Sequence, residues 1–259
     1  MLLELRGVQI RYGDMVVLPA IDLAVPQGQF LGVIGPNGAG KSSLFGAISG
    51  GLRCSAGTVR LEGRDVTRLG ATQRCMAGVG RTFQIPQPFD GMTVFENVLV
   101  AATYGGRSRG AQATAQASSV VRQCGLEPWA DSLAGALTLL QRKRLELARA
   151  MAMRPRLLLL DEVAGGLTDS EVAELVQWIV QLQREGVTVL WIEHLVHALV
   201  GVVDRMLVLA EGRIIADGAP RDVLADPIVR SCYLGSELDE DLEEDLEEDL
   251  GEEMRDASH

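Results

Sequence analysis

The sequence predicts an α/β fold with a mainly parallel sheet at its core. Apolar runs at 157–160, 187–192 and 205–210 have the length of strands and lack polar alternation, as expected of strands covered on both faces. Helical patterns separate these runs. A further apolar run at 30–34 leads into a glycine-rich segment and then a helix start at Lys41, which predicts a strand–loop–helix unit early in the chain.

Two smaller units flank this core in the sequence. Runs at 2–10 and 15–25, joined by a turn at Tyr12-Gly13-Asp14, predict an N-terminal antiparallel β subdomain. Further along, Thr93 and Glu96 have the spacing of a capping box, so a helix is expected from there to about residue 103. Helical patterns at 111–123 and 139–153 follow. We therefore expect an α-helical subdomain at about 85–153.

The formal charge of -11 is concentrated at one end of the chain. Residues 236–259 hold 13 of the 35 acidic residues and only Arg255 as a base, so the body is close to neutral, with 22 acids and 23 bases. Such a body lacks the positive excess typical of nucleic-acid binders. We predict a domain over 1–236 and a disordered acidic tail over 237–259. Leucines at every fourth position of the tail leave open a helix formed on a partner.

The cysteines and apolar segments limit the cellular setting. The four cysteines have no Cys-x-x-Cys spacing, which argues against a zinc site or a secreted disulfide framework and favours a reducing compartment. No signal peptide is recognised at the start. The longest uncharged run, 23–40, is interrupted by Pro26 and Pro36 and does not predict a membrane span. Contact with a membrane is expected through a partner.

The glycine-rich segment matches the P-loop pattern. In such loops, glycines let backbone N–H groups surround the phosphates of a nucleotide, and the following helix directs its positive end at them. Lys41 would contribute a charge to the phosphates and Ser42 a hydroxyl to Mg²⁺. The candidate nucleotide-binding residues of this segment are Gly35, Pro36, Asn37, Gly38, Ala39, Gly40, Lys41, Ser42 and Ser43.

The run Leu157-Leu158-Leu159-Leu160 followed by Asp161 and Glu162 predicts a Walker B strand. Asp161 would emerge at the carboxyl end of the strand to hold Mg²⁺ through water. Glu162 lies one residue further and is the candidate general base for the attacking water. Alone, the run is also compatible with a buried strand followed by two acids at a helix start.

With these motifs in order, residues up to about 236 resemble the ATP-binding cassette ATPases. Tyr12 is similar to the aromatic residue that stacks on adenine in that family. Gln84, within Arg81-Thr82-Phe83-Gln84, resembles the Q-loop glutamine, which contacts Mg²⁺ and the attacking water and senses the membrane subunit. His194 matches the switch histidine at the γ-phosphate. The resemblance implies ATP and Mg²⁺ as cofactors, and we expect His197 on a helix surface and Trp191 in the core.

The signature segment of that family departs from its usual Leu-Ser-Gly-Gly-Gln. Here it is Leu137-Thr138-Leu139-Leu140-Gln141, and Gly165-Gly166-Leu167-Thr168 stands at the D-loop. In the family, two cassettes associate head to tail, and each ATP lies between the P-loop of one and the signature of the other. Loss of the two glycines affects the partner's site. We therefore hypothesise an asymmetric heterodimer whose hydrolytic site is built on this chain.

Two further segments resemble the ATPases of bacterial branched-chain amino acid importers. They are 81–98 and the ending 226–235. Relatives of that group carry urea, short amides or other amino acids. The resemblance implies a peripheral subunit at the cytoplasmic face of the inner membrane. Its partners would be integral permease subunits, a second cassette and, indirectly, an extracytoplasmic solute-binding protein.

Three alternatives remain at this point. A soluble cassette ATPase acting on nucleic acid or the ribosome would typically carry a second cassette, a coiled-coil insertion or basic stripes, and none is recognised; we expect no nucleic-acid partner. A non-hydrolysing regulatory subunit is suggested by the altered signature, but Glu162 and His194 are intact. A P-loop kinase or GTPase would lack the series of Gln84, signature helix and His194.

Overall fold

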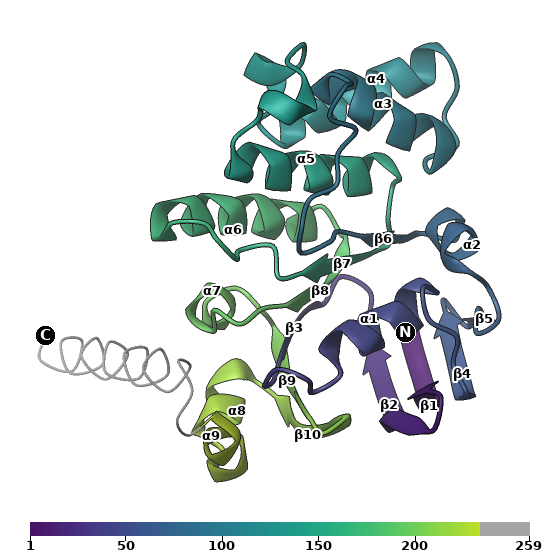
Figure 1. Ribbon diagram of the computed structural model, residues 1–259, viewed down its shortest axis with the longest axis vertical. Coiled ribbons are helices and arrows are strands. Elements are labelled where there is room, and N and C mark those ends of the chain that lie inside the picture. The colour runs from purple at the N-terminus through teal and green to yellow at the C-terminus, as the bar shows by residue number, and fades with distance from the viewer. Residues whose placement is uncertain (234–259) are drawn as a thin grey trace, which may run out of the picture.

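The predicted parallel sheet lies at the centre of the molecule in the computed structural model, which describes residues 1–233 (Figure 1). The predicted tail over 237–259 falls outside the described residues. The strand order is β10-β9-β3-β8-β7-β6, and only the β10–β9 pair is antiparallel. The strands are β3 (Phe30–Ile34), β6 (Val79–Arg81), β7 (Leu157–Asp161), β8 (Thr188–Ile192), β9 (Arg205–Ala210) and β10 (Arg213–Gly218).

Strand β7 explains why four consecutive leucines are needed. Leu157 and Leu159 pack into the core cluster that also contains Phe45 of α1 (Lys41–Ser49). Leu158 and Leu160 pack into the other large cluster, which contains residues of α6 (Asp169–Arg184). Because successive side chains of a strand point to opposite faces, a strand covered on both faces needs apolar residues at every position.

The N-terminal residues form the expected antiparallel sheet, with strand order β2-β1-β4-β5. It extends beyond the predicted hairpin by two strands that were not predicted, because β4 pairs with β1 and β5 pairs with β4. Tyr12, expected in the turn, is the last residue of β1. The strands are β1 (Leu3–Tyr12), β2 (Met15–Val25), β4 (Ala56–Leu61) and β5 (Arg64–Asp65).

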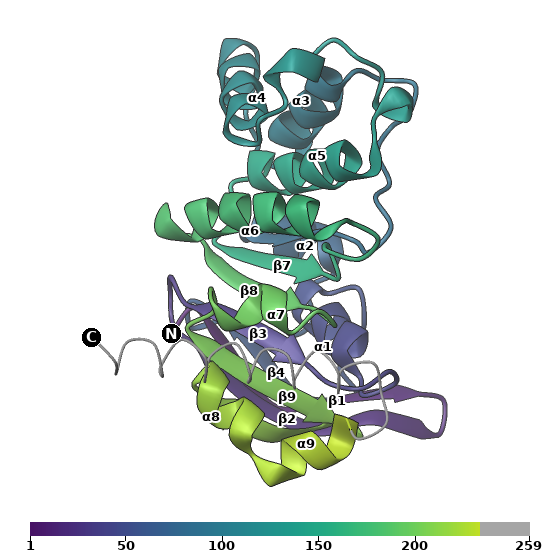
Figure 2. The ribbon, with the colours of Figure 1, turned by 90° about the vertical axis from the view of Figure 1, so that its left-hand side faces the viewer.

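Helices α3, α4 and α5 pack together at the end of the molecule opposite this antiparallel sheet (Figures 1 and 2). Their bounds are close to those predicted: α3 (Val94–Tyr104), α4 (Ala111–Gln123) and α5 (Leu139–Ala152). Two 3₁₀ turns, Glu127–Trp129 and Ala134–Ala136, lie between α4 and α5. The capping box expected at Thr93 and Glu96 is present, and the helical subdomain of the expected fold is confirmed.

The remaining helices are α2 (Ala71–Met76), α7 (His197–Val200), α8 (Pro220–Ala225) and α9 (Pro227–Tyr233). His197 is exposed on α7 and Trp191 is fully buried, as predicted. Within residues 1–233, none of the helices combines the length and the apolar character that a membrane span requires.

Candidate nucleotide-binding and catalytic site

Four strands of the parallel sheet end at the same edge, and each is followed by predicted site residues. The glycine-rich loop follows β3, Asp161 ends β7, Glu193-His194 follows β8, and Gln84 follows β6. Strand β8 lies between β3 and β7, with Ile192 level with both Val33 and Asp161. Parallel strands bring their carboxyl ends together, so residues far apart in the chain meet here.

The loop after β3 requires glycine where its backbone approaches neighbouring segments. Gly35 has φ +150°, and a Cβ there would lie 2.0 Å from the carbonyl oxygen of Leu209. Gly40, at φ +102°, is the N-cap of α1, and no side chain caps this helix. No acidic residue occupies its first turn. An uncapped helix start leaves N–H groups and a positive dipole end available to an anion, so this loop fits the phosphates of a nucleotide.

Lys41 is buried and directed back along the loop. Its Nζ donates to the carbonyl oxygens of Gly35 and Pro36. Burial lowers the pKa of the Lys41 ammonium, and the carboxylates of Glu162 and Asp161 oppose that shift. The ammonium therefore faces the same space as the two acids.

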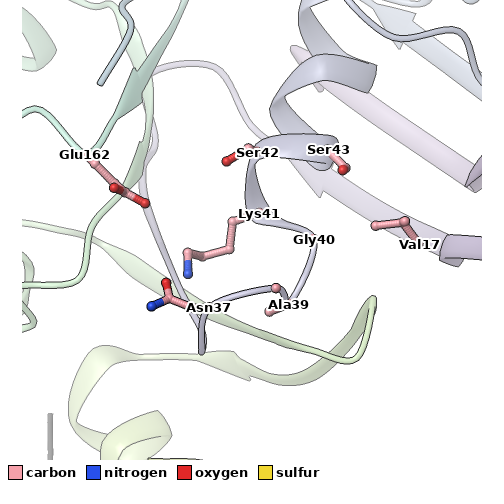
Figure 3. Close-up of a pocket in the computed structure, with 9 residues that line it drawn as sticks. Val17, Asn37, Ala39, Gly40, Lys41, Ser42, Ser43 and Glu162 are labelled. Atoms are coloured by element: carbon pink, nitrogen blue, oxygen red, sulfur yellow. The ribbon is translucent and has the colours of Figure 1, made fainter. Parts of the chain in front are cut away.

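This space is a pocket of about 270 Å³ lined by Val17, residues 37–43 and Glu162. In Figure 3 the side chains of Lys41 and Glu162 approach it from different elements. Gly35 and Pro36 contribute carbonyl groups to Lys41 instead of lining it. The sequence prediction of one phosphate-binding segment is thus matched by a pocket in which the candidate base lies opposite the candidate lysine.

Asp161 has a partner that the sequence analysis did not identify as functional. Arg81 Nη2 lies 2.7 Å from Asp161 Oδ2, and the guanidinium is also 5.2 Å from the centre of the Phe83 ring. The register of β6 with β7, in which Arg81 pairs with Leu159, brings the two side chains together. In the sequence, the available signal was a basic residue, Arg81, and an acidic residue, Asp161, each at the end of an apolar strand. Only the order of the strands in the sheet makes these two residues neighbours.

Glu162 is in contact with both Gln84 and His194, and the three residues were predicted from separate segments. Gln84 Nε2 donates to Glu162 Oε2, and His194 Nε2 lies 2.9 Å from Glu162 Oε1. Because an ionised carboxylate only accepts hydrogen bonds, His194 carries its proton on Nε2 in this arrangement. The side chains of Glu162 and His194 are 16% and 35% exposed, so the carboxylate remains accessible from the pocket.

Tyr12 and Asp161, unlike the loop residues 37–43, do not line the pocket. Tyr12 is half-exposed at the end of β1 and does not line the pocket. Ser42 lines it, whereas Asp161 is held by Arg81 beside it. Within residues 1–233, no three His, Cys, Asp or Glu side chains form a metal site by themselves. This donor set fits Mg²⁺, which commonly takes one or two protein oxygens and completes its shell with water and substrate phosphates.

The two leucines that replace signature glycines have different surroundings. Leu140 is buried in the core cluster beneath α6. Leu139 is 42% exposed, and a Cβ placed on Gly166 would lie 3.3 Å from its Cδ2. Only Leu139 therefore adds an apolar side chain to the surface, next to the D-loop glycine.

Comparison with known proteins agrees with this geometry. Residues 18–165 match the family model described as ABC transporter, and residues 213–239 match the model described as branched-chain amino acid ATP-binding cassette transporter. The chain belongs to the ABC transporter family, and it is an ATPase cassette coupled to transport.

Among its relatives is the high-affinity branched-chain amino acid transport ATP-binding protein BraF of Pseudomonas aeruginosa, 35% identical over 90% of this chain and 98% of the relative. The corresponding protein LivG of Escherichia coli K12 is 33% identical over the same shares. A solved ATP-binding cassette of an ABC transporter, in its ADP conformation, is 29% identical, with a TM-score of 0.84 over 91% of this chain and 99% of the other. The family and the fold expected from the sequence are confirmed.

Proposed function

We propose that this chain hydrolyses ATP at the pocket of the glycine-rich loop and thereby drives an importer of branched-chain amino acids or related small polar solutes. The observation that carries the catalytic part is the contact of Gln84 and His194 with the two oxygens of Glu162, beside that pocket. A candidate base held by two donors is oriented before the nucleotide arrives, which is the condition for efficient general-base catalysis.

The residues of the site have the following roles in this proposal. The loop 35–43 binds the phosphates through backbone N–H groups, and the Lys41 ammonium turns from the loop carbonyls to the β- and γ-phosphates. Glu162 accepts the proton of the attacking water, while Gln84 positions that water and His194 contacts the γ-phosphate. Tyr12 stacks on the adenine.

Mg²⁺ would be held by Ser42, Asp161 and Gln84, and when bound it neutralises charge on the phosphate oxygens. Arg81 holds one oxygen of Asp161, which keeps this carboxylate at the edge of the sheet. The proposed ligands of the ATP phosphates and Mg²⁺ therefore lie at the carboxyl ends of the adjacent strands β3, β8, β7 and β6.

The relatives support the proposed solute class. The names of both family models and of BraF and LivG refer to transport. The model matched at residues 213–239 is that of branched-chain amino acid ATP-binding cassette transporters. We place the chain at the cytoplasmic face of the inner membrane, bound to integral permease subunits that receive solute from an extracytoplasmic binding protein. The solute itself would not contact this subunit.

The second cassette of the complex would differ from this chain. If two cassettes meet head to tail, Leu139 faces the partner's nucleotide where a glycine backbone would otherwise approach it. The site built on this chain keeps its own base and histidine and uses the partner's signature. We therefore propose a heterodimer with one hydrolytic site.

Purification of the tagged chain from its native membrane tests this function. We expect permease subunits and a second cassette to co-purify, and ATPase activity to disappear in Glu162→Gln. Recovery of ribosomes or nucleic acid would contradict the transport role. Activity unchanged by Glu162→Gln would assign hydrolysis to the other cassette and leave this chain as a regulatory subunit. A fully active homodimer would contradict the asymmetry.

A further inference from the structure

Glu193, which lies between β8 and His194, is a buried carboxylate without a role in the site described so far. It is 2% exposed. Its Oε1 accepts from the backbone N–H of Ala164 at 2.7 Å and from Trp191 Nε1 at 3.0 Å, and its Oε2 accepts from the backbone N–H of His194 at 3.3 Å. One side chain therefore connects the segment after β7 with the segment after β8.

The segment after β7 needs such a connection because Glu162 has an unfavourable backbone conformation. Its φ is +48°, in the left-handed region that residues other than glycine seldom adopt. Conformations of this kind cost on the order of 1–3 kcal/mol and persist only where surrounding contacts impose them. Two contacts flank Glu162: its own N–H donates to Ile192 at 2.9 Å, and the N–H of Ala164 donates to Glu193.

Glu193 and Lys143 are two buried ionisable residues close to the turn that contains Glu162. Burial raises the pKa of Glu193 to about 7, while its three N–H donors and the Lys143 ammonium act in the opposite direction. Lys143 is a buried residue of α5, and burial lowers the pKa of its ammonium against the attraction of Glu193 and Glu162. Buried charges often stabilise a fold less than apolar residues of the same size would. A stabilising role alone is thus a weak explanation for this pair.

We propose that Glu193 is a positioning residue, which holds Glu162 and His194 in contact by binding the backbone N–H groups of Ala164 and His194. This inference rests on the roles proposed above for Glu162 and His194. Loss of the Glu193 carboxylate releases the turn after Glu162 and the start of the segment that carries His194. The base and its donor then sample other positions, while the phosphate-binding loop after β3 keeps its structure.

The test measures ATP hydrolysis and nucleotide binding by the intact transporter complex that contains Glu193→Ala or Glu193→Gln. For Glu193→Ala we expect kcat to fall by about tenfold or more, with KM and the affinity for a fluorescent ATP analogue changed less than about threefold. Glu193→Gln keeps an oxygen for Ala164 and Trp191, so we expect it to recover part of this loss. It should retain a deficit in kcat of about threefold because it cannot accept equally at His194.

Asp204→Ala is the matched control, because Asp204 Oδ2 also accepts from a backbone N–H, that of Phe30 at 2.7 Å, but at the opposite end of β3. This variant should lower Tm and leave kcat within about twofold of wild type. If Asp204→Ala lowers kcat as much as Glu193→Ala at equal Tm, or if both Glu193 variants keep wild-type kcat, the positioning role is wrong.

Glu162→Gln serves as the reference for the proposed site. If it retains activity, the roles of the site fail and this inference fails with them. If it is inactive while Glu193→Ala is fully active, only the positioning role is refuted. Should Glu193→Ala not fold, the kcat of the isosteric Glu193→Gln decides: a deficit of about threefold supports the role, and wild-type kcat contradicts it.

Discussion

The starts of helices α1 and α5 differ in a way that separates the two nucleotide-facing surfaces expected of a cassette. Helix α1 follows Gly40 and has no side-chain cap, so its first N–H groups are available to an anion. Helix α5 follows Thr138, whose hydroxyl accepts from the N–H of Gln141, while Gln141 accepts from the N–H of Thr138. One helix start is open to phosphate and the other is closed by a capping box.

The two helix starts also differ in the residues that surround them. Around α1 lie Lys41, Glu162 and His194. At α5 the surface carries the exposed Leu139 beside Gly166. An exposed apolar side chain suits packing better than phosphate binding, and it supports the proposal of a complex whose two ATP sites are unequal.

The largest effect is expected on the α1 side. We expect Glu162→Gln to lower the ATPase rate by about 10²- to 10⁴-fold, because the amide cannot accept the proton of the attacking water. Nucleotide affinity should remain close to wild type. Steady-state hydrolysis and equilibrium binding measure both quantities. Glu171→Gln, in the capping box of α6, is the control and should keep full activity. If Glu162→Gln were as active as wild type, the site at α1 would not be the hydrolytic site, and its proposed difference from the surface at α5 would be wrong.

The raised pKa of Glu193 predicts how the free energy of unfolding depends on pH. Its pKa rises from 4.5 in the unfolded chain to about 7 in the fold, so between these values the folded protein holds a proton that the unfolded chain releases. The contribution of Glu193 to stability is therefore greatest below pH 4.5 and declines as pH rises to about 7, by about 3 kcal/mol. The Lys143 ammonium of α5 acts on the charge of Glu193, and it is attracted to Glu162 as well.

Urea unfolding of wild type and Glu193→Gln at pH 5 and pH 8 measures this effect. From pH 5 to pH 8, the unfolding free energy of wild type should fall relative to that of Glu193→Gln. The same pH dependence in both proteins would show that Glu193 does not titrate in this range. A variant that is more stable at pH 8 but slower in hydrolysis would indicate that the carboxylate serves the site at the expense of the fold.

Leu139 and Leu140 of α5 should differ in how much stability their truncation costs. Leu140→Ala removes a buried side chain and should lower the free energy of unfolding by about 2–3 kcal/mol. Leu139→Ala removes a side chain that is 42% exposed and should cost less than about 1 kcal/mol. Chemical denaturation compares them. Similar losses would mean that Leu139 is as much a core residue as Leu140.

A smaller effect than that of Leu140→Ala is expected at the cap of α5. Thr138→Ala removes the acceptor for the N–H of Gln141 and should destabilise the protein by about 1 kcal/mol. Thr138→Ser keeps the acceptor and is the control. Thermal unfolding distinguishes the two, and an unchanged Tm for Thr138→Ala would mean that this helix start is not stabilised by its cap.

The sequence by itself determined the elements whose residues act locally. Apolar runs without alternation predicted β3, β7, β8 and β9, because a strand buried on both faces has no polar positions. The loop 35–43 was predictable because its glycines, together with Lys41 and Ser42, follow the P-loop pattern. Gln84 and His194, which contact Glu162, were predicted from the resemblance to the ATP-binding cassette ATPases. Strand β6 has only three residues, which is too few for a period to be recognised.

Only the tertiary structure decided which strand ends meet. The insertion of β8 between β3 and β7 brings Glu193 to the N–H of Ala164, and the pairing of β6 with β7 brings Arg81 to Asp161. Likewise, Leu139 and Leu140 are adjacent and chemically identical, yet one is buried and the other exposed, because the helix directs consecutive side chains to different faces. Contacts of this kind depend on strand order, register and helix orientation, which no single segment of the chain encodes.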